Sequence, residues 1–556
     1  MLGIRAGRKW TAVIAGVVVV TVVGGVILPR LLDPPAMEQW IYQQLGTQMF
    51  DALTGPQLEE QIAAQQLVSN LTVAQFVEMN AARLSELRAG DTFIPTWKMP
   101  SGVNAVRYVT TPAGEAYQAM ALSVLQFEVE KLGVTQIRLG IRWADTISPS
   151  GQFSLAVYRP YLNFLTQYQG ASGRRVQVLL GVGPMKSPGW PESFVPVADE
   201  YSATANTEFI PQGGLPGVGS VIGPGANNAD LISCAENWLN TLMWRVSYQY
   251  PSINYFQLDN EPLNPAGTQQ WTMSPGLEQQ LAGIVLRYKP EANFLVNWTG
   301  TANLVAVSSF KGSTKIGEAL KLARVFAHHS VISEMLQMRS AILKAIQVED
   351  GHGNVTLGVD SYHLTPNTPT LPIKVQIQGH SYYLRPDSLA LIDIVEKLAG
   401  YQHPWRYLRR LGVPLEVTEL QASPWAPYTA PGNNPKELMF ELERVLQILP
   451  QNKPSVVRFW TLSNVVYNLM YNAKDFSYPG NPISMRDPTG KFIANNEAEL
   501  ELVTAISGVS PITTKAGLTT VDFSPIASVI TQELVSQEAK TVLLSQHATA
   551  KSQRSN

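Results

Sequence analysis

Two short apolar segments of this chain each end on a glutamate, and they constrain its fold more than any other feature. The first runs over residues 255–262 and closes on Asp259-Asn260-Glu261-Pro262, and the second covers residues 413–420 and contains Thr418-Glu419. Residues 355–363 and 456–460 likewise end in polar or aromatic side chains. Catalytic residues of a (β/α)8 barrel lie at the carboxyl ends of its strands. We therefore expect an α/β fold, a (β/α)8 TIM barrel.

The rest of the chain alternates between strand-like and helix-like patterns, as a barrel requires. The expected strands are residues 105–109, 134–143, 176–181, 255–258, 293–298, 355–361, 413–420 and 456–460. The expected helices are residues 115–132, 158–169, 235–250, 277–288, 389–398, 435–449 and 497–506. A long loop over 184–229 and a polar, helical insertion over 311–348 interrupt this alternation, and specificity is expected to lie in them.

The N-terminus predicts a membrane anchor. Arg5, Arg8 and Lys9 precede an uncharged, apolar run over residues 10–28. About 20 apolar residues are needed to span a bilayer, whereas the core of a signal peptide is usually about 7 to 15 residues long. The pattern favours an uncleaved transmembrane helix over a cleaved signal. The basic residues before the run predict a single-pass protein of the cell membrane with its catalytic domain extracytoplasmic.

The expected domain organisation follows from these patterns. Residues 1–33 form a cytoplasmic stub and the transmembrane anchor, residues 34–92 a helical stalk or collar, residues 93–510 the barrel, and residues 511–556 a peripheral tail. Within the stalk, helices are expected over 37–53, 56–68 and 72–87. Thr72 followed by Gln75 resembles a capping box for the last of them.

Composition and motifs exclude several classes of protein. The formal net charge is −2, so no basic field is available to hold nucleic acid. Cys234 is the only cysteine, which excludes an internal disulfide and fits a buried small residue best. The chain contains no His-Glu-x-x-His, no phosphate-binding glycine-rich loop and no Gly-x-Ser-x-Gly elbow. We expect neither a metal nor a cofactor.

Glu261 and Glu419 are the candidate catalytic pair. Glycosidic bonds are cleaved by two carboxyl groups that flank the anomeric carbon. These two glutamates close strands four and seven of the expected barrel, so they would face each other across one rim. Glu416 is a rival for the second position. It lies three residues before Glu419 on the same strand, so we expect it to point to the other face and to lie deeper.

The chain resembles the glycoside hydrolase clan A superfamily, the cellulase- and xylanase-like (β/α)8-barrel retaining glycosidases. The resemblance covers most of residues 100–510 and is carried by Asn260-Glu261-Pro262 and Thr418-Glu419. The strand-seven pattern resembles the xylanase-type families and the strand-two pattern the cellulase-type families, so no individual family is assigned. Further matching residues are Arg138 and Trp143 on strand two, Tyr362 on strand six and Trp460 on strand eight.

The resemblance implies a role for each matching residue. Glu261 would be the acid/base and Glu419 the nucleophile, with Asn260 bonded to the sugar 2-hydroxyl. Arg138 and Tyr362 would hold the Glu419 carboxylate, although Arg138 could instead pair with a core carboxylate. Trp460 would floor the subsite of the reacting sugar. The other candidate substrate contacts are His363, Trp143, Trp298 and Trp425, although His363 could be structural and isolated tryptophans are more often core residues.

The implied function is that of a membrane-anchored retaining glycoside hydrolase, which would cleave β-glycosidic bonds of an oligo- or polysaccharide by double displacement. Its expected partners are the carbohydrate substrate and the membrane, the latter through residues 10–28. Two alternatives remain open at this point. One is a catalytically inactive carbohydrate-binding or cell-surface scaffold, and the other is a glycan-processing or transglycosylating enzyme of polysaccharide export.

Overall fold

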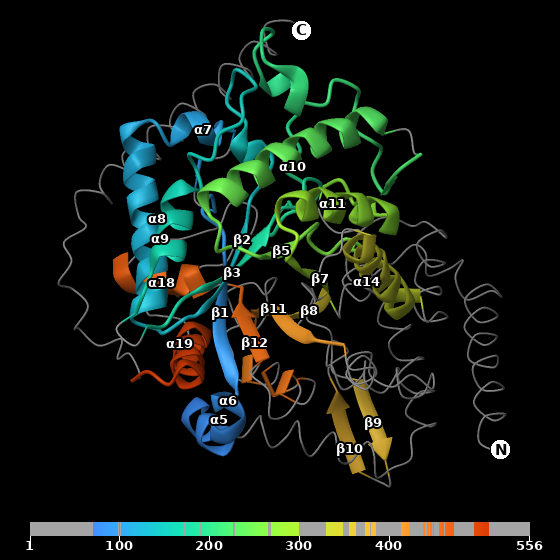
Figure 1. The fold of residues 1–556 in the computed structure, drawn as a ribbon. Coiled ribbons are helices and arrows are strands. Elements are labelled where there is room, and N and C mark those ends of the chain that lie inside the picture. Colours follow the sequence, from blue (N-terminus) through green and yellow to red (C-terminus); the bar gives the residue numbers. More distant parts are fainter. Residues whose placement is uncertain are drawn as a thin grey trace, which may run out of the picture.

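The computed structural model describes the central part of the chain, with gaps (Figure 1). The described residues are 71–97, 99–100, 102–170, 173–189, 191–225, 228–264, 268–299, 330–348, 355–362, 373–377, 380–384, 413–421, 438–439, 442–443, 445–446, 449, 455–460, 462–471 and 494–510. The expected membrane anchor, most of the stalk and the C-terminal tail lie outside these residues. No helix within the described ranges has both the length and the apolar character needed to cross a bilayer.

Parallel strands close into a barrel in the order β1-β12-β11-β8-β7-β5-β3-β2, and β2 pairs with β1. The eight strands are β1 (Leu87–Phe93), β2 (Gln136–Gly140), β3 (Gln177–Gly181), β5 (Tyr255–Gln257), β7 (Asn293–Thr299), β8 (Val355–Tyr362), β11 (Leu415–Gln421) and β12 (Ser455–Phe459). Each pairs in parallel with its neighbours on both sides. The predicted (β/α)8 TIM barrel is confirmed.

Seven of these strands lie where the sequence predicted them, but the first was misplaced. Residues 105–109 contain helix α7 (Ala105–Tyr108), and the first strand is β1, which lies at the end of the segment assigned to the stalk and runs one residue beyond it. Its sequence, Leu-Arg-Ala-Gly-Asp-Thr-Phe, lacks the apolar run of a buried strand. Asp91 and Thr92 are nevertheless buried, and Asp91 accepts a hydrogen bond from Ser463 at 2.5 Å. At Gly90 an added Cβ would lie 2.4 Å from the Gln136 carbonyl oxygen.

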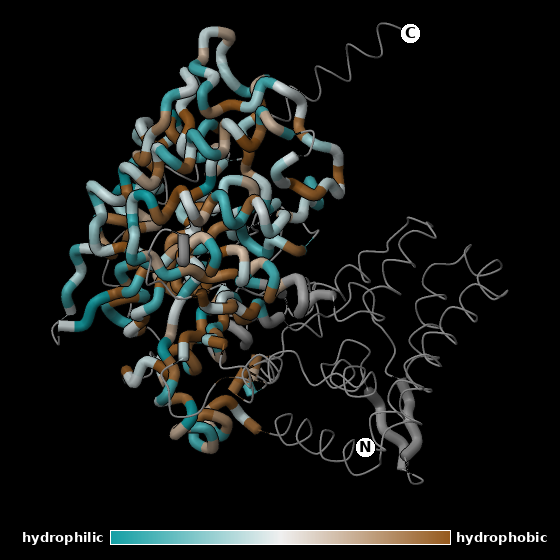
Figure 2. Tube along the Cα trace, turned by 45° about the vertical axis from the view of Figure 1, so that its right-hand side comes forward, coloured by the Kyte–Doolittle hydropathy of each residue, from teal (hydrophilic) through white to brown (hydrophobic). Residues whose placement is uncertain are grey.

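Helices form the layer outside the barrel (Figure 1). They are α8 (Pro112–Glu130), α9 (Arg159–Gln167), α10 (Ala229–Gln249), α11 (Pro275–Tyr288), α14 (Ser330–Val348), α18 (Leu462–Tyr471) and α19 (Ala494–Ser507). Their apolar faces and the outward faces of the strands form one continuous core. Along the helices and strands, hydrophobic residues alternate with hydrophilic ones (Figure 2). The expected insertion over 311–348 supplies α14, which packs on α11, β7 and β8 as a barrel helix. Helix α18 was not predicted.

Two short helices, α5 (Val73–Met79) and α6 (Ala81–Ser85), precede the barrel. The capping box predicted at the start of α5 is confirmed. The Gln75 amide donates to Thr72 Oγ1 at 3.2 Å, and the Thr72 amide donates to Gln75 Oε1 at 2.9 Å. The expected single helix over 72–87 is interrupted at Asn80, which caps α5 and begins α6.

The loops carry small elements of their own. The long loop over 184–229 contains β4 (Val221–Ile222), which pairs in parallel with β6 (Thr272–Met273). After β8, β9 (Ile373–Ile377) and β10 (His380–Leu384) form an antiparallel pair. The 3-10 turns are η1 (Ala144–Thr146), η2 (Ala198–Glu200) and η3 (Thr207–Phe209). Cys234 is buried on α10, and burial raises the pKa of its thiol to about 11.

Candidate active site

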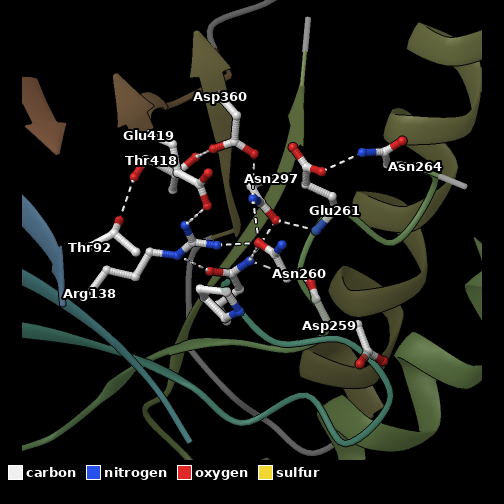
Figure 3. Close-up of polar contacts among 12 residues, drawn as sticks. Thr92, Arg138, Asp259, Asn260, Glu261, Asn264, Asn297, Asp360, Thr418 and Glu419 are labelled. Atoms are coloured by element: carbon white, nitrogen blue, oxygen red, sulfur yellow. Dashed lines mark hydrogen bonds and ion pairs between the residues drawn. The ribbon is translucent and has the colours of Figure 1, made fainter. Parts of the chain in front are cut away.

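The guanidinium of Arg138 connects β2 with β5 and β11 inside the barrel (Figure 3). Arg138 lies on β2 and is fully buried. Its Nη1 forms an ion pair with Glu419 Oε1, its Nη2 donates to Asn260 Oδ1, and its Nε donates to Gln257 Oε1 at 2.7 Å. A guanidinium has only donors, so each of these partners turns an oxygen toward it.

Because Arg138 can only donate hydrogen bonds, it fixes the orientation of the side-chain amides of Gln257, Asn297 and Asn260. Because Gln257 presents its oxygen to Arg138, its amide nitrogen donates to Asn297 Oδ1 at 2.5 Å. The nitrogen of Asn297 then donates to Asn260 Oδ1 at 3.0 Å and to Asp360 Oδ2 at 2.6 Å. The Asn260 amide nitrogen is consequently turned away from Arg138. Hydrogen-bond polarity therefore runs from Arg138 to the Asp360 carboxylate.

Glu261 follows β5 in an unusual backbone conformation. Its φ is +42°, in the left-handed region that few residues other than glycine adopt. Three contacts with other side chains hold it there: its amide donates to Asn297 Oδ1 at 2.7 Å, its carbonyl accepts from Lys186 Nζ at 3.1 Å, and its Oε2 accepts from Asn264 Nδ2 at 2.5 Å. Burial raises the pKa of Glu261 well above its usual value, and the charge of Asp360 raises it further. The side chain is therefore placed to carry a proton.

Glu419 lies on β11 next to a change of register. Val417 pairs with Val359 of β8, but Glu419 pairs with Asp360, so Thr418 is an extra residue in the strand. Burial raises the pKa of the Glu419 carboxyl to about 8, the Arg138 guanidinium opposes this rise, and the charge of Glu261 adds to it. The ion pair with Arg138 therefore stabilises the ionised form of Glu419 against the effect of burial, whereas the nearby charge of Asp360 adds to the effect of burial at Glu261.

Asp360 is a third carboxyl group in the network, and the sequence analysis did not single it out. It lies on β8 and is fully buried. Its Oδ1 accepts from Thr418 Oγ1 at 2.5 Å, and Asn297 donates to its other oxygen. Burial, together with the charge of Glu419, raises its pKa to about 7. Its position near the end of an expected strand marks Asp360 as a candidate site residue, but the family resemblance pointed to Tyr362, two residues later.

The loop after β3 contributes Lys186 and Glu192, which the sequence analysis also missed. Lys186 Nζ forms an ion pair with Glu192 at 2.8 Å and donates to the Asn264 carbonyl at 2.7 Å. The charge of Glu192 also raises the pKa values of Glu261 and Glu419. The start of the 184–229 loop therefore borders the carboxyl network. Neither residue stands in a motif, so only the tertiary contact identifies them.

Trp143 is a correction to the expected site. Its ring is fully buried and stacks on Trp238 with the ring centroids 5.9 Å apart. Its Nε1 donates to the Phe209 carbonyl at 3.0 Å. A ring enclosed in this way offers no face to a sugar, and the structure does not bring it to the carboxyl network. The tryptophan follows β2 but packs into the helical layer.

The remaining predicted residues are only partly described. Trp460 is half-buried directly after β12, and its amide donates to the Leu420 carbonyl at 3.1 Å. The backbones of Trp298 and Tyr362 belong to β7 and β8, but their side chains lie outside what the structure describes. His363 and Trp425 lie outside the described residues altogether.

Glu416 occupies a different place from the one expected. Its Oε2 accepts from Arg458 Nη1 of β12 at 2.9 Å, and its charge helps to raise the pKa of the buried Tyr255 phenol on β5. Two strands separate β5 from β11 in the sheet, so this interaction crosses the barrel interior. The expectation that Glu416 points to the outer face is wrong. The extra residue at Thr418 brings both glutamates to the inside, with Glu416 nearer the amino end of β11.

Among the described residues, no group of three histidine, cysteine, aspartate or glutamate side chains is arranged to hold a metal ion. The centre of the site holds three buried carboxyl groups, one buried guanidinium and the amides that join them, and the Lys186–Glu192 ion pair borders it. The Glu419 carboxyl is paired with the Arg138 cation, and the Glu261 carboxyl lies near the negative charges of Asp360 and Glu192. Such an arrangement can supply an ionised and a protonated carboxyl group side by side.

No protein-family model matches the chain, and no curated protein matches its sequence. Several solved structures are similar. The exo-beta-1,4-mannosidase Op5Man5 from Opitutaceae bacterium strain TAV5 is 14% identical, with 76% of this chain and 60% of that chain covered and a TM-score of 0.38. A GH10 endoxylanase from a sugarcane soil metagenome is 12% identical (75% and 97% covered, TM-score 0.37). The virulence factor SghA, solved with its substrate analog salicin, is 11% identical (80% and 99% covered, TM-score 0.41).

Proposed function

We propose that this protein is a membrane-anchored retaining glycoside hydrolase that cleaves β-glycosidic bonds of an oligo- or polysaccharide. One observation carries the proposal. Glu261 follows β5 and Glu419 lies on β11, and both belong to one buried network in which burial raises the pKa of each, but the Arg138 cation opposes this rise at Glu419 while the charge of Asp360 adds to it at Glu261. Glu419 is held by Arg138, and Glu261 lies beside Asp360. Glycosidases of the retaining type need such a pair, one carboxylate and one carboxylic acid.

In the first step, the Glu419 carboxylate attacks the anomeric carbon and Glu261 gives its proton to the departing oxygen. In the second step, water attacks the anomeric carbon of the glycosyl ester, the bond to Glu419 breaks and releases its carboxylate, and Glu261 takes the proton from the water. The charge of one glutamate raises the pKa of the other. Esterification of Glu419 removes its charge, so the pKa of Glu261 falls and the residue can act as a base.

The neighbouring groups take supporting roles in this proposal. Arg138 orients the Glu419 carboxylate and stabilises its ionised form. The amide nitrogen of Asn260, turned away from Arg138, donates to the sugar 2-hydroxyl. Trp460, at the end of β12, floors the subsite of the reacting sugar, while Tyr362, His363, Trp298 and Trp425 stay candidate substrate contacts. Residues 10–28 hold the barrel on the extracytoplasmic side of the cell membrane.

The full-length chain, purified in detergent, tests the proposal. Aryl β-glycosides and β-glucan, mannan and xylan polymers are offered to the parent and to Glu261→Ala and Glu419→Ala, with and without azide. We expect both variants to lose activity. Azide should give a glycosyl azide of retained configuration with Glu261→Ala and of inverted configuration with Glu419→Ala. Glu416→Gln is the matched control, because it changes a glutamate of the same strand outside the Arg138 network.

Each of the remaining outcomes would support a different site, nucleophile or function. Unchanged activity in both alanine variants contradicts the site, and azide rescue of Glu416→Ala instead of Glu419→Ala reassigns the nucleophile. If no substrate is cleaved but glycans bind, the scaffold alternative replaces the hydrolase. Products longer than the substrate, formed when acceptor sugars are added, indicate the transglycosylating alternative.

A further inference from the structure

Asp360 has no part in the two-carboxyl mechanism, yet it occupies the centre of the site. It is fully buried and pairs with Glu419 in the register of β8 and β11. It is also a hydrogen-bonding neighbour of Glu261. Figure 3 shows the Asp360 carboxyl above Asn297, with Glu419 on one side and Glu261 on the other. Both glutamates therefore border the same carboxyl group.

The surrounding hydrogen bonds present Asp360 as an acceptor. Its Oδ2 receives the Asn297 amide nitrogen, which is fixed as a donor because Asn297 Oδ1 already accepts from Gln257 and from the Glu261 amide. Its Oδ1 receives the Thr418 hydroxyl. Hydrogen bonds donated to both oxygens favour the ionised form of a carboxyl group. The side chain of Glu261, by contrast, receives one such bond, from Asn264.

We propose that Asp360 is a positioning carboxylate that shares one proton with Glu261 and keeps that proton on Glu261. This inference rests on the proposed function, since it assigns a purpose to the protonated state of the acid. Two adjacent buried carboxyl groups do not both ionise readily, and the partner with fewer donated hydrogen bonds retains the proton. Here that partner is Glu261, and Asp360 accepts the hydrogen bond from it.

The charge balance of the first chemical step is consistent with this role. Before the step, Glu419 and Asp360 are ionised and Glu261 is protonated. A bond then forms between Glu419 and the anomeric carbon, the bond to the departing oxygen breaks, and the Glu261 proton moves to that oxygen. Afterwards Glu261 and Asp360 are ionised and Glu419 is a neutral ester. The negative charge thus moves from one neighbour of Asp360 to the other, and the total charge of the three groups is unchanged.

Asp360→Asn tests this proposal because it keeps the shape and removes the charge. The alkaline limb of kcat/KM, which reports loss of the acid proton, should move to lower pH by about one unit or more. At neutral pH, kcat should fall more for aryl glycosides with poor leaving groups than for a dinitrophenyl glycoside, whose departure needs no acid. KM should change little. A residue with only a structural role would lower activity equally at every pH.

A second measurement requires no substrate and therefore separates this proposal from the proposed hydrolase function. Infrared spectra of the full-length protein report protonated carboxyl groups by their C=O stretching band, and subtraction of the Glu261→Gln spectrum isolates Glu261. We expect the Glu261 band to disappear at a lower pH in Asp360→Asn than in the parent. If no substrate is cleaved, the hydrolase fails, and this titration still decides whether the proton is shared.

Asp91→Asn is the matched control, since Asp91 is also a fully buried barrel aspartate that accepts from a hydroxyl, but it faces the helical layer. It should leave the Glu261 band and the alkaline limb in place. Thr418→Val serves if Asp360→Asn does not fold. Removal of one donor to Asp360 should weaken the Glu261 band at neutral pH, as the proton moves to Asp360. An unchanged Glu261 titration in a folded variant of either kind overturns the proposal.

Discussion

Arg138 of β2 and Glu419 of β11 form a buried ion pair across the interior of the barrel, although two strands, β1 and β12, separate them in the sheet. The same guanidinium fixes the amides of Gln257 and Asn260. The fork geometry of arginine allows these three contacts at once, whereas a lysine ammonium is a single point charge on a flexible stem.

Arg138→Lys should therefore lower kcat/KM by about 100-fold or more, because a misplaced nucleophile loses its alignment even where the charge is kept. Steady-state kinetics on the best aryl glycoside, with melting curves beside them, provide the measurement. Arg458→Lys is the control, since that arginine pairs with Glu416 outside this network. Equal activity losses in the two variants would show that the effect is one of stability.

The pH dependence of hydrolysis should be displaced toward alkaline pH. The nucleophile must be ionised, and the pKa of Glu419 is raised to about 8 by burial and the charge of Glu261, against the opposing Arg138. Activity should therefore rise as the pH passes from 7 to 8. It should fall only at higher pH, where Glu261, whose pKa is also raised, loses its proton. An acidic limb of kcat/KM near pH 4 to 5 would contradict this.

Stability should decrease between pH 4 and pH 7, and a carboxyl group outside the site should contribute to this decrease beside those of the site. Burial raises the pKa of Asp91 from 3.8 to about 7. In that range the folded protein holds a proton that the unfolded chain has released, so the free energy of unfolding falls as the pH rises. Asp91→Asn should reduce this slope in melting temperatures measured across the range. The neighbouring Glu128, whose pKa is raised as well, should retain part of it. An identical slope in the variant would refute the assignment.

Gly358 leaves the space that the amide network needs. It pairs with Asn297 across β7 and β8, and an added Cβ would lie 2.8 Å from Thr418 Oγ1 and 2.9 Å from Asn297 Cβ. Gly358→Ala should destabilise the fold by about 1–3 kcal/mol, as overpacking does, and should impair hydrolysis. Gly283→Ala on α11 is the matched control, because an added Cβ there meets nothing within 4 Å. It should stabilise the fold by up to about 1 kcal/mol. Chemical denaturation measures both.

Local patterns predicted most of the barrel because its outer strand faces and its helices are apolar. Seven strands were placed correctly, and Thr72 was recognised as the start of α5. The first strand was missed because β1 buries polar residues, such as Asp91, that a hydropathy pattern assigns to the surface. Glu416 was assigned to the wrong face because strict alternation cannot anticipate the extra residue at Thr418.

The sequence by itself determined the barrel and drew attention to Glu261, Glu419, Asn260 and Arg138, because strand periodicity and the position of a residue at a strand end are local properties. Only the tertiary structure decided which polar groups meet. Gln257, Asn297 and Asp360 come from three strands and carry no motif, yet one guanidinium sets the hydrogen-bond polarity of all three. Trp143 was excluded for the same reason, since its packing against Trp238 depends on a helix far along the chain. Contacts across the interior of a barrel join residues distant in sequence, and no local pattern records them.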